Sequence, residues 1–171
     1  LIVWQVRDGW VPLLERGLAS AELDGDPGGQ SRPRALLGWV LSEEGRPAEA
    51  LVQLERAPEL AALAGDTAGD TAGEAIARIN LTVALTRSGA AERGARERGG
   101  GHDRDGAGER GGGRERARDL LVRALALAER AGHTETATLA RQHLTHHLLA
   151  NGSPAEAAAH ALAALGVLTD R

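Results

Sequence analysis

The sequence predicts an all-α fold, a solenoid of about seven helices arranged as antiparallel pairs, and three observations lead to this prediction. Alanine (33 residues) and leucine (25 residues) dominate the 171-residue chain, and both are strong helix formers. Aromatic residues make up only 2% of the chain, although strands prefer aromatic and β-branched residues. A common pattern also returns every 40 residues once two insertions are set aside, which is typical of helical repeats.

The repeat is anchored by Gly45, Gly89 and Gly152, each of which follows a leucine-containing stretch at the same distance. These glycines are 44 and 63 residues apart. A four-residue duplication within 65–72, Gly-Asp-Thr-Ala written twice, accounts for the first excess, and the 23-residue stretch 91–113 accounts for the second. Both spacings are 40 residues without these insertions, so the chain contains about three and a half units.

The first three helices follow from this register. The stretch 9–24 carries the Leu-Glu-Arg and glycine pattern that recurs 40 residues later, so the chain opens within an incomplete unit. The next helix rests on Leu37 and Leu41, an i, i+4 apolar pair. The third rests on an apolar stripe at helical spacing that begins at Ala50 and includes Ala57.

Capping signals set the ends of the later helices. Thr71 and Glu74 form a capping box, and Ser153 and Glu156 form a second one with proline at the first helical position. Glycines that can adopt a left-handed cap stand where helices should stop. They are Gly25, Gly45, Gly65, Gly89, Gly132 and Gly152. The predicted helices are 9–24, 32–44, 47–64, 72–88, 115–131, 134–150 and 154–168.

We expect residues 1–171 to form one domain. The stretch 91–113 is expected to be a flexible Gly/Arg-rich loop between the two helices of unit two, where additional length costs little. The chain contains no Met and therefore no initiator, which indicates a piece of a longer protein or a processed product. The parts of the domain are a partial unit 1–25, unit one 32–65, unit two 72–132 and unit three 134–171.

Composition excludes several kinds of chemistry. The chain has no Cys, which excludes disulfides, thiol nucleophiles and zinc–thiolate sites. All 20 basic residues are Arg, which excludes a P-loop lysine and a Schiff-base lysine. The net charge of −4 provides no general attraction to nucleic acid or anionic lipid, and no apolar run approaches the roughly 20 residues that span a bilayer. We therefore expect a soluble cytoplasmic protein that binds neither nucleic acid nor membrane.

Two motif-like patterns in the insertion are interpreted as chance matches. The stretch 106–111 fits G-x-G-x-x-G, but glycines and charged residues precede it rather than the buried strand of a dinucleotide site. Arg98 and Arg110, each followed by two glycines, resemble an RNA-binding tract, yet acidic residues balance the arginines and no aromatic residue can stack on a base. The serines lie at helix ends or surfaces, where capping explains them. We expect no cofactor and no enzyme activity.

The histidines of the last unit are a further candidate site. His143, His146 and His147 are spaced so that three imidazoles lie near one another on a helix, which could hold a divalent metal. However, the chain has no Cys and Glu156 lies on another helix. We therefore expect no metal site, with His143 and His146 in a groove or in solvent and His147 partly packed.

The repeated unit resembles the tetratricopeptide repeat. The resemblance rests on a small residue after leucine in the first helix, as in Leu37-Gly38, on a glycine-centred turn, and on Ala50-x3-Leu54-x2-Ala57 in the second helix. The 40-residue spacing is similar to the variant in large bacterial regulators, such as antibiotic-regulatory activators and signal-transduction ATPases. The resemblance implies a right-handed superhelix that binds a partner and carries no chemistry of its own.

The resemblance also implies that the first helices of the units line a concave, partner-binding groove. Trp39 is a candidate hot spot there, because a large aromatic side chain can fill a pocket of a partner; alternatively, it packs between neighbouring units. The groove residues are Leu36, Trp39 and Glu43 in unit one, Ile79, Asn80, Val83 and Arg87 in unit two, and Gln142, His143 and His146 in unit three.

The sequence therefore predicts a non-catalytic interaction or sensor segment of a larger cytoplasmic regulator of transcription, which binds a protein or peptide in this groove. The partner could also be another domain of the same parent chain or a second copy. The alternative prediction is a small-molecule or peptide-pheromone receptor whose groove closes over the ligand. An enzyme is the third and weakest alternative, because no group of residues supports catalysis.

Overall fold

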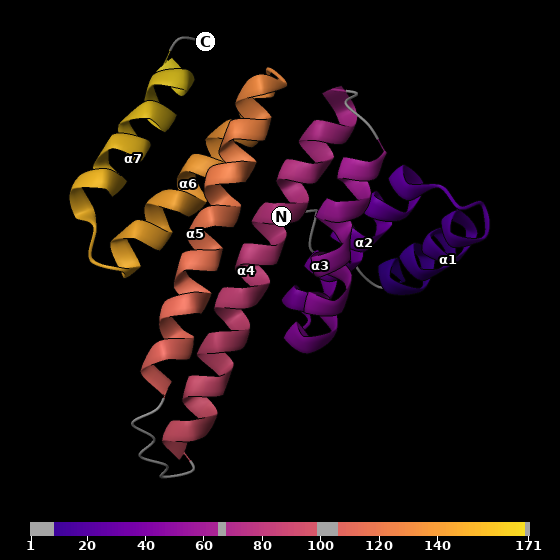
Figure 1. The fold of residues 1–171 in the computed structure, drawn as a ribbon, viewed down its shortest axis with the longest axis horizontal. Helices are drawn as coiled ribbons and strands as arrows, with labels where there is room; N and C mark the ends of the chain where they lie inside the picture. Colours follow the sequence, from indigo (N-terminus) through magenta and orange to yellow (C-terminus); the bar gives the residue numbers. More distant parts are fainter. Residues whose placement is uncertain (1–8, 65–67, 99–105, 170–171) are drawn as a thin grey trace.

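The computed structural model describes residues 9–64, 68–98 and 106–169, which form seven α-helices and no strand (Figure 1). The predicted all-α fold is therefore confirmed. None of the described helices is long and apolar enough to cross a membrane. The helices are α1 (Trp10–Leu23), α2 (Pro27–Glu43), α3 (Pro47–Leu63), α4 (Ala68–Arg98), α5 (Gly106–Arg130), α6 (Thr134–Ala150) and α7 (Pro154–Thr169).

Most turns between helices follow the repeat register. The bounds of α1, α3, α6 and α7 lie within one residue of the predicted ones. Gly25, Gly45, Gly132 and Gly152 each have a positive φ, between 65° and 79°, and each lies two residues after the end of the preceding helix. This left-handed conformation costs glycine nothing and lets the chain reverse within three residues. The glycine stops predicted at these four positions are confirmed.

α2 begins at Pro27, five residues before the predicted start. A proline at the first helical position loses no hydrogen bond, because its N–H would have no helical acceptor. The Ser31 hydroxyl donates a hydrogen bond to the carbonyl oxygen of Ala57 at 2.8 Å, which fixes this part of α2 on α3. The sequence predicts a later start because Pro33 and two glycines locally disfavour a helix. Contact with α3 stabilises the first turns of α2, and local helix propensity does not include this effect.

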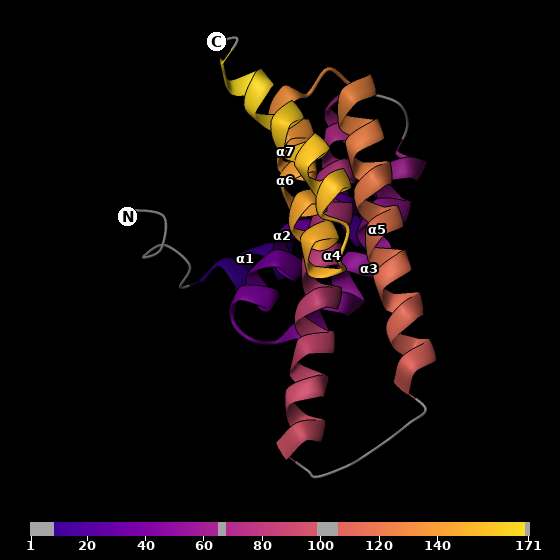
Figure 2. The same cartoon turned by 90° about the vertical axis from the view of Figure 1, so that its left-hand side faces the viewer.

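The insertion 91–113 is helical over most of its length, so the predicted loop is wrong there. α4 continues to Arg98 and α5 begins at Gly106, while 99–105 lie outside the described residues. Figures 1 and 2 show these extensions of α4 and α5 side by side, projecting beyond the other helices. A helix that is already nucleated gains one hydrogen bond for each residue it adds, which lets α4 continue through 91–98, a stretch rich in Ala, Arg and Glu.

Two predicted helix ends fall inside α4 and are wrong. The capping box predicted at Thr71 does not start the helix, because α4 already begins at Ala68. The stop predicted at Gly89 is also absent, because α4 runs through this residue without a positive φ. Gly65, predicted to end the third helix, lies outside the described residues. The repeat register therefore predicts the four glycine turns. At Gly89, however, the expected turn is absent, and longer helices take its place.

Each described helix packs closely against the next one along the chain. In addition, α2 packs against α4, and α4 packs against α6. α4 thus contacts four other helices, whereas the backbones of α1 and α7 each approach only one. The helices that begin the three complete units, α2, α4 and α6, therefore form a continuous row.

The core consists of small side chains and leucines at equivalent positions of the repeat. Ala50, Ala117 and Ala157 are buried at one position, and Leu54 and Leu121 are buried at another. Alanine lets helix backbones approach, and leucine fills the remaining space, with each fully buried leucine contributing about 1.5–3 kcal/mol. The stabilising contacts are therefore distributed along the chain among neighbouring helices.

Candidate functional site

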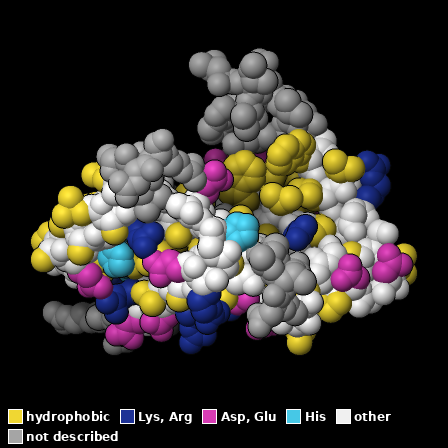
Figure 3. Space-filling view, turned by 90° about the horizontal axis from the view of Figure 1, so that it is seen from above, with side chains coloured by type: hydrophobic (Ala, Val, Ile, Leu, Met, Phe, Trp, Pro, Cys, Tyr) yellow, Lys and Arg dark blue, Asp and Glu magenta, His cyan; other side chains and the backbone are white. Residues whose placement is uncertain are grey.

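The ten residues predicted to line a groove lie on α2, α4 and α6, the row of mutually contacting helices. Three of them are on α2, four on α4 and three on α6. Nine keep part of their surface exposed, and one is buried. The structure thus brings the predicted residues onto one set of adjacent helices. Figure 3 views the molecule from above, where apolar, charged and His side chains share one face.

The end of this row nearest α1 is aromatic and apolar. The rings of Trp10 on α1 and Trp39 on α2 lie with their centroids 6.4 Å apart and their planes tilted by 58°. Tilted ring pairs at this separation attract through their quadrupoles. Both Trp side chains are half-buried, and Leu36 on α2 is 43% exposed. Trp39 therefore packs against the neighbouring helix while keeping part of its surface available.

Polar side chains in the middle of the row connect α4 to α2. The Asn80 amide donates a hydrogen bond to the carbonyl oxygen of Ala35 at 3.3 Å. Nη1 of Arg87 donates to the carbonyl oxygen of Ser42 at 2.9 Å and lies 2.7 Å from Oε1 of Glu43. Two of the predicted groove residues, Arg87 and Glu43, thus form an ion pair with each other, and the Arg87 side chain remains 45% exposed.

Ile79 does not belong to the exposed face, and its prediction as a groove residue is wrong. Its side chain is only 1% exposed and packs in a core cluster that includes Leu121 and Leu144. Successive residues of a helix point about 100° apart, so Ile79 and Asn80 cannot both face the same direction. The equivalent residues of the other units differ, since Ala35 is buried and Gln142 is exposed, so the repeat position alone does not identify Ile79 as core.

The end of the row on α6 is polar. Gln142 and His146 are exposed, whereas His143 is half-buried. Burial lowers the pKa of His143, and the nearby His146 lowers it further. No three His, Asp or Glu residues of the described part of the chain lie close enough together to hold a metal ion. This end of the face therefore presents hydrogen-bonding groups and an imidazole that favours its neutral form.

The third histidine, His147, faces the second helix of the preceding unit. It is half-buried, and burial lowers its pKa. The positive charges of Arg118 and Arg114 on α5 lower it further. Nδ2 of Asn151 lies 3.3 Å from Nε2 of His147, within hydrogen-bond distance. The expectation that His147 is partly packed is confirmed.

An open hollow of about 370 Å³ adjoins the ion pair between Glu43 and Arg87. Ser42, Gly45 and Pro47 complete its lining. The Ser42 side chain is only 5% exposed, and its hydroxyl has no hydrogen-bond partner among the described residues. A buried hydroxyl without a partner costs about 1–3 kcal/mol, so a polar group that entered the hollow and reached this oxygen would recover part of that cost.

Sequence reasoning missed a set of arginines at one position of the repeat, each paired with a glutamate. These arginines are Arg34, Arg78 and Arg141. The first and third pair with Glu22 and Glu129 of the preceding helix, each at 2.5 Å, and the second pairs with Glu74 of its own helix. The helix that precedes Arg78, α3, has Ala62 where α1 and α5 have these glutamates, which explains the change of partner. Aligning charged as well as apolar residues would have revealed these pairs.

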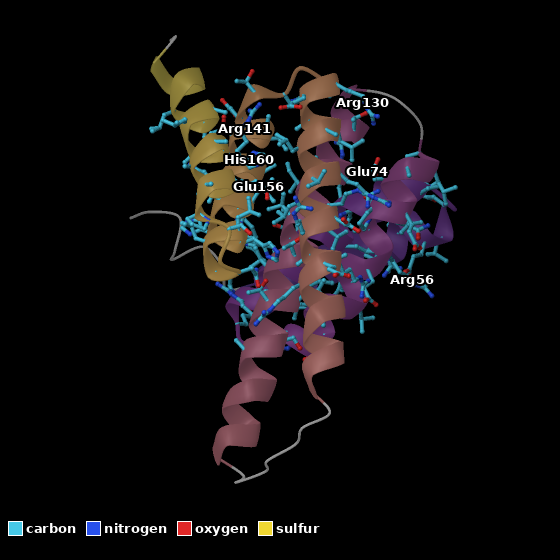
Figure 4. The ribbon with its side chains drawn as sticks, turned by 60° about the vertical axis from the view of Figure 1, so that its left-hand side comes forward. Arg56, Glu74, Arg130, Arg141, Glu156 and His160 are labelled. Atoms are coloured by element: carbon cyan, nitrogen blue, oxygen red, sulfur yellow. The ribbon has the colours of Figure 1, made fainter. Side chains whose placement is uncertain are left out.

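Trp10 was missed for a different reason. The repeat register aligns it with Ala50, Ala117 and Ala157, and these small residues give no sign that an aromatic ring at this position contacts Trp39. The side of the molecule formed by α3, α5 and α7 carries ion pairs instead. Arg118 on α5 lies 2.6 Å from Glu156 on α7, whose side chain is labelled in Figure 4. Exposed pairs of this kind contribute little stability, and we assign them no function.

No protein-family model matches the sequence, and a comparison with curated proteins also gives no match.

Proposed function

We propose that this protein is a non-catalytic interaction or sensor segment of a larger cytoplasmic regulator of transcription, and that it binds a protein or peptide. The binding surface is the exposed face of α2, α4 and α6, together with Trp10 of α1. The observation that carries the proposal is the half-buried Trp10–Trp39 pair beside the exposed Leu36. Exposed aromatic and apolar side chains next to hydrogen-bonding groups are typical of the centre of a protein interface.

The proposed face belongs to a right-handed superhelix of the tetratricopeptide type, built from antiparallel helix pairs. The packing order supports this part of the proposal, because each helix contacts the next and the first helices of consecutive units contact one another. The left-handed turns at Gly45 and Gly152 support it as well, since each joins the two helices of a unit within three residues. Such stacking leaves one face of the first helices open for a partner.

The two ends of the face favour different parts of a ligand. Leu36, Trp39 and Trp10 at one end offer apolar surface. Arg87 and His146 lie farther along the row and offer hydrogen-bond donors and acceptors. We therefore expect an extended or helical peptide with an aromatic or aliphatic anchor at one end and polar groups at the other.

The test is a selection of binders from a random peptide library displayed on phage, followed by affinity measurement with synthetic peptides. Trp39→Ala and Leu36→Ala should each weaken binding of the selected peptides at least about tenfold, because truncating an interface anchor typically costs about 2 kcal/mol or more. Circular dichroism should show that both variants retain the helical content of the wild type.

Matched controls are Val52→Ala on α3 and Val122→Ala on α5, which truncate exposed aliphatic side chains on other helices. Both should bind the selected peptides as the wild type does. The proposal is overturned if the control substitutions weaken binding as much as Leu36→Ala. A loss of helical content in Trp39→Ala would assign Trp39 to the packing between units and leave Leu36 as the test of the face.

The second candidate function is a receptor for a small molecule or a short peptide pheromone. The hollow beside Arg87 favours this receptor function. Ser42 is one of the residues that line the hollow, and its buried hydroxyl has no hydrogen-bond partner among the described residues. A thermal-shift screen against a panel of metabolites and short peptides tests this candidate. A ligand that raises the melting temperature of the wild type, but not that of Ser42→Ala, would support it; no shift across the panel would count against it.

A further inference from the structure

We propose that α4 has two alternative ends, one at Arg98 and one at Gly89, and that the projecting parts of α4 and α5 open and close about Gly89. In the closed form α4 runs through Gly89, as described above. In the open form Gly89 adopts a left-handed conformation and ends the helix. This inference does not rest on the proposed function.

The repeat assigns Gly89 the position of a helix stop. Gly45 and Gly152, its equivalents in the other units, have φ values of 76° and 79°. In each of those turns a single residue separates the glycine from the proline that begins the next helix, Pro47 or Pro154. In unit two, the insertion separates the glycine from the equivalent helix start. Gly89 is thus the residue type that ends helices in the other units, although it lies in the interior of α4.

Several described anchors of α4 lie just before this glycine. The buried side chains of α4 extend from Ala72 to Ala84 among those described. Beyond them, Arg87 connects α4 to the end of α2 through the carbonyl oxygen of Ser42 and the carboxylate of Glu43. An end at Gly89 would keep all of these contacts, because they lie on the N-terminal side of the glycine.

The extensions themselves have a composition that weakens a helix. Their backbones, at 91–98 and 106–113, contain six glycines, and glycine is the least favourable helix residue after proline. A Cβ added at Gly112 or Gly113 would meet no atom within 4 Å, so packing does not explain these two glycines. The free energy that holds the extensions closed is therefore small compared with that of the core.

Arg87 lies in the row formed by α2, α4 and α6. At one edge of this row, the open and closed forms would expose different surfaces. A partner that binds one form more tightly than the other would shift the population by the ratio of its two affinities. Gly89 is the residue at which such a change would stop, because the described contacts of α4 with α2 and with the core precede it. The device requires no rearrangement of the core.

Hydrogen exchange of the full chain, read by mass spectrometry, tests the proposal. In the wild type, the amides of 91–98 should exchange at least about tenfold faster than those of 76–84, after correction for intrinsic rates. Gly89→Ala should slow exchange at 91–98, because alanine favours the helix and disfavours the left-handed end. Gly89→Asn should exchange faster than Gly89→Ala there, because asparagine tolerates the left-handed conformation.

The comparison of Gly89→Ala with Gly89→Asn controls for crowding, since both substitutions add a Cβ. The amides of 76–84 report the core in the same molecule, so a variant that fails to fold would show faster exchange there too. Gly17→Ala, at an exposed glycine inside α1, should leave exchange at 91–98 unchanged. Equal protection of 91–98 and 76–84 in the wild type, or equal exchange of the alanine and asparagine variants at 91–98, would overturn the proposal.

Discussion

At the scale of single residues, a close approach between α2 and α3 depends on Gly38. A Cβ added there would lie 2.3 Å from Cγ of Leu54, a fully buried side chain. Gly38→Ala should therefore destabilise the protein by about 1–2 kcal/mol, because overpacking outweighs the gain in helix propensity. Urea unfolding followed by circular dichroism measures this. Gly17→Ala is the control, since its added Cβ meets nothing within 4 Å and should stabilise by up to about 1 kcal/mol.

Two histidines make stability depend on pH. Burial, followed by His146, lowers the pKa of His143; burial, followed by Arg118 and Arg114, lowers that of His147. Because both pKa values lie below the ordinary 6.5, the unfolded chain binds protons first as the pH falls. The stability that the neutral forms contribute is therefore complete above about pH 6.5 and decreases below it.

The expected result is a free energy of unfolding that decreases between about pH 7 and pH 5 in the wild type. A variant with His143→Gln and His147→Gln should show a shallower decrease, because glutamine does not titrate. Urea unfolding at a series of pH values gives both slopes. Identical slopes for the wild type and the double variant would contradict the assignment.

Part of the candidate site could be predicted residue by residue. The repeat register places Trp39, Arg87 and His146 on three adjacent helices, and the structure confirms this placement. Register alone does not give the rotation of each helix, so it assigned the buried Ile79 to the face. It also does not reveal the contact of Trp10 with Trp39, because the residues equivalent to Trp10 are alanines. Both differences concern three-dimensional packing, which spacing along the chain does not specify.

At the scale of helices, we expect that the insertion can be removed without loss of the core. Among the described side chains, the members of the core clusters on α4 and α5 lie outside 91–113. Deleting 91–113 would leave one residue, Ala90, between Gly89 and the start of the next helix, as in the turn that contains Gly45. We expect the shortened chain to fold cooperatively with a melting temperature close to that of the wild type.

Thermal unfolding followed by circular dichroism measures this outcome. The helical signal should decrease by the contribution of the deleted extensions, and the transition should remain a single step. A control deletion of the same length, 47–69, removes α3 and should abolish the cooperative transition, because α3 provides buried contacts to two neighbours. Loss of cooperativity in the first deletion would show that the extensions are part of the core.

Helix boundaries were predictable where sequence signals and packing agree. α6 and α7 begin at the predicted residues, because a glycine turn precedes each of them. The start of α2, both ends of α4 and the start of α5 were not predictable from local propensity. Contact with α3 stabilises the glycine-rich start of α2, and propagation from the core extends α4 and α5. Neither effect can be predicted from the local sequence.

At the scale of the whole molecule, the helices differ in how many neighbours support them. α4 contacts four helices, while the backbone of α1 approaches only α2. The stability of such an assembly is approximately a sum over neighbouring elements. Leu81→Ala in α4 should therefore increase hydrogen exchange in all helices, because it truncates a buried side chain at a cost of about 2–5 kcal/mol. Leu18→Ala should increase exchange mainly in α1.

The two substitutions are matched, since each truncates a buried leucine within a helix. Peptide-resolved exchange by mass spectrometry distinguishes a local from a global effect. A uniform increase across all helices for Leu18→Ala would contradict the prediction, because it would mean that α1 unfolds only together with the rest. Restriction of the effect of Leu81→Ala to α4 would contradict it as well.

The packing order also has a consequence for how the chain is made. Every described pair of closely packed helices is either consecutive or separated by one helix, so no early helix must wait for a distant partner. Such low contact order is associated with fast folding. While the ribosome is still synthesising α6 and α7, α1 to α4 can already bury their shared surfaces. During synthesis, only the helix pair made last therefore has apolar surface that is not yet buried. This limits the apolar surface available for aggregation.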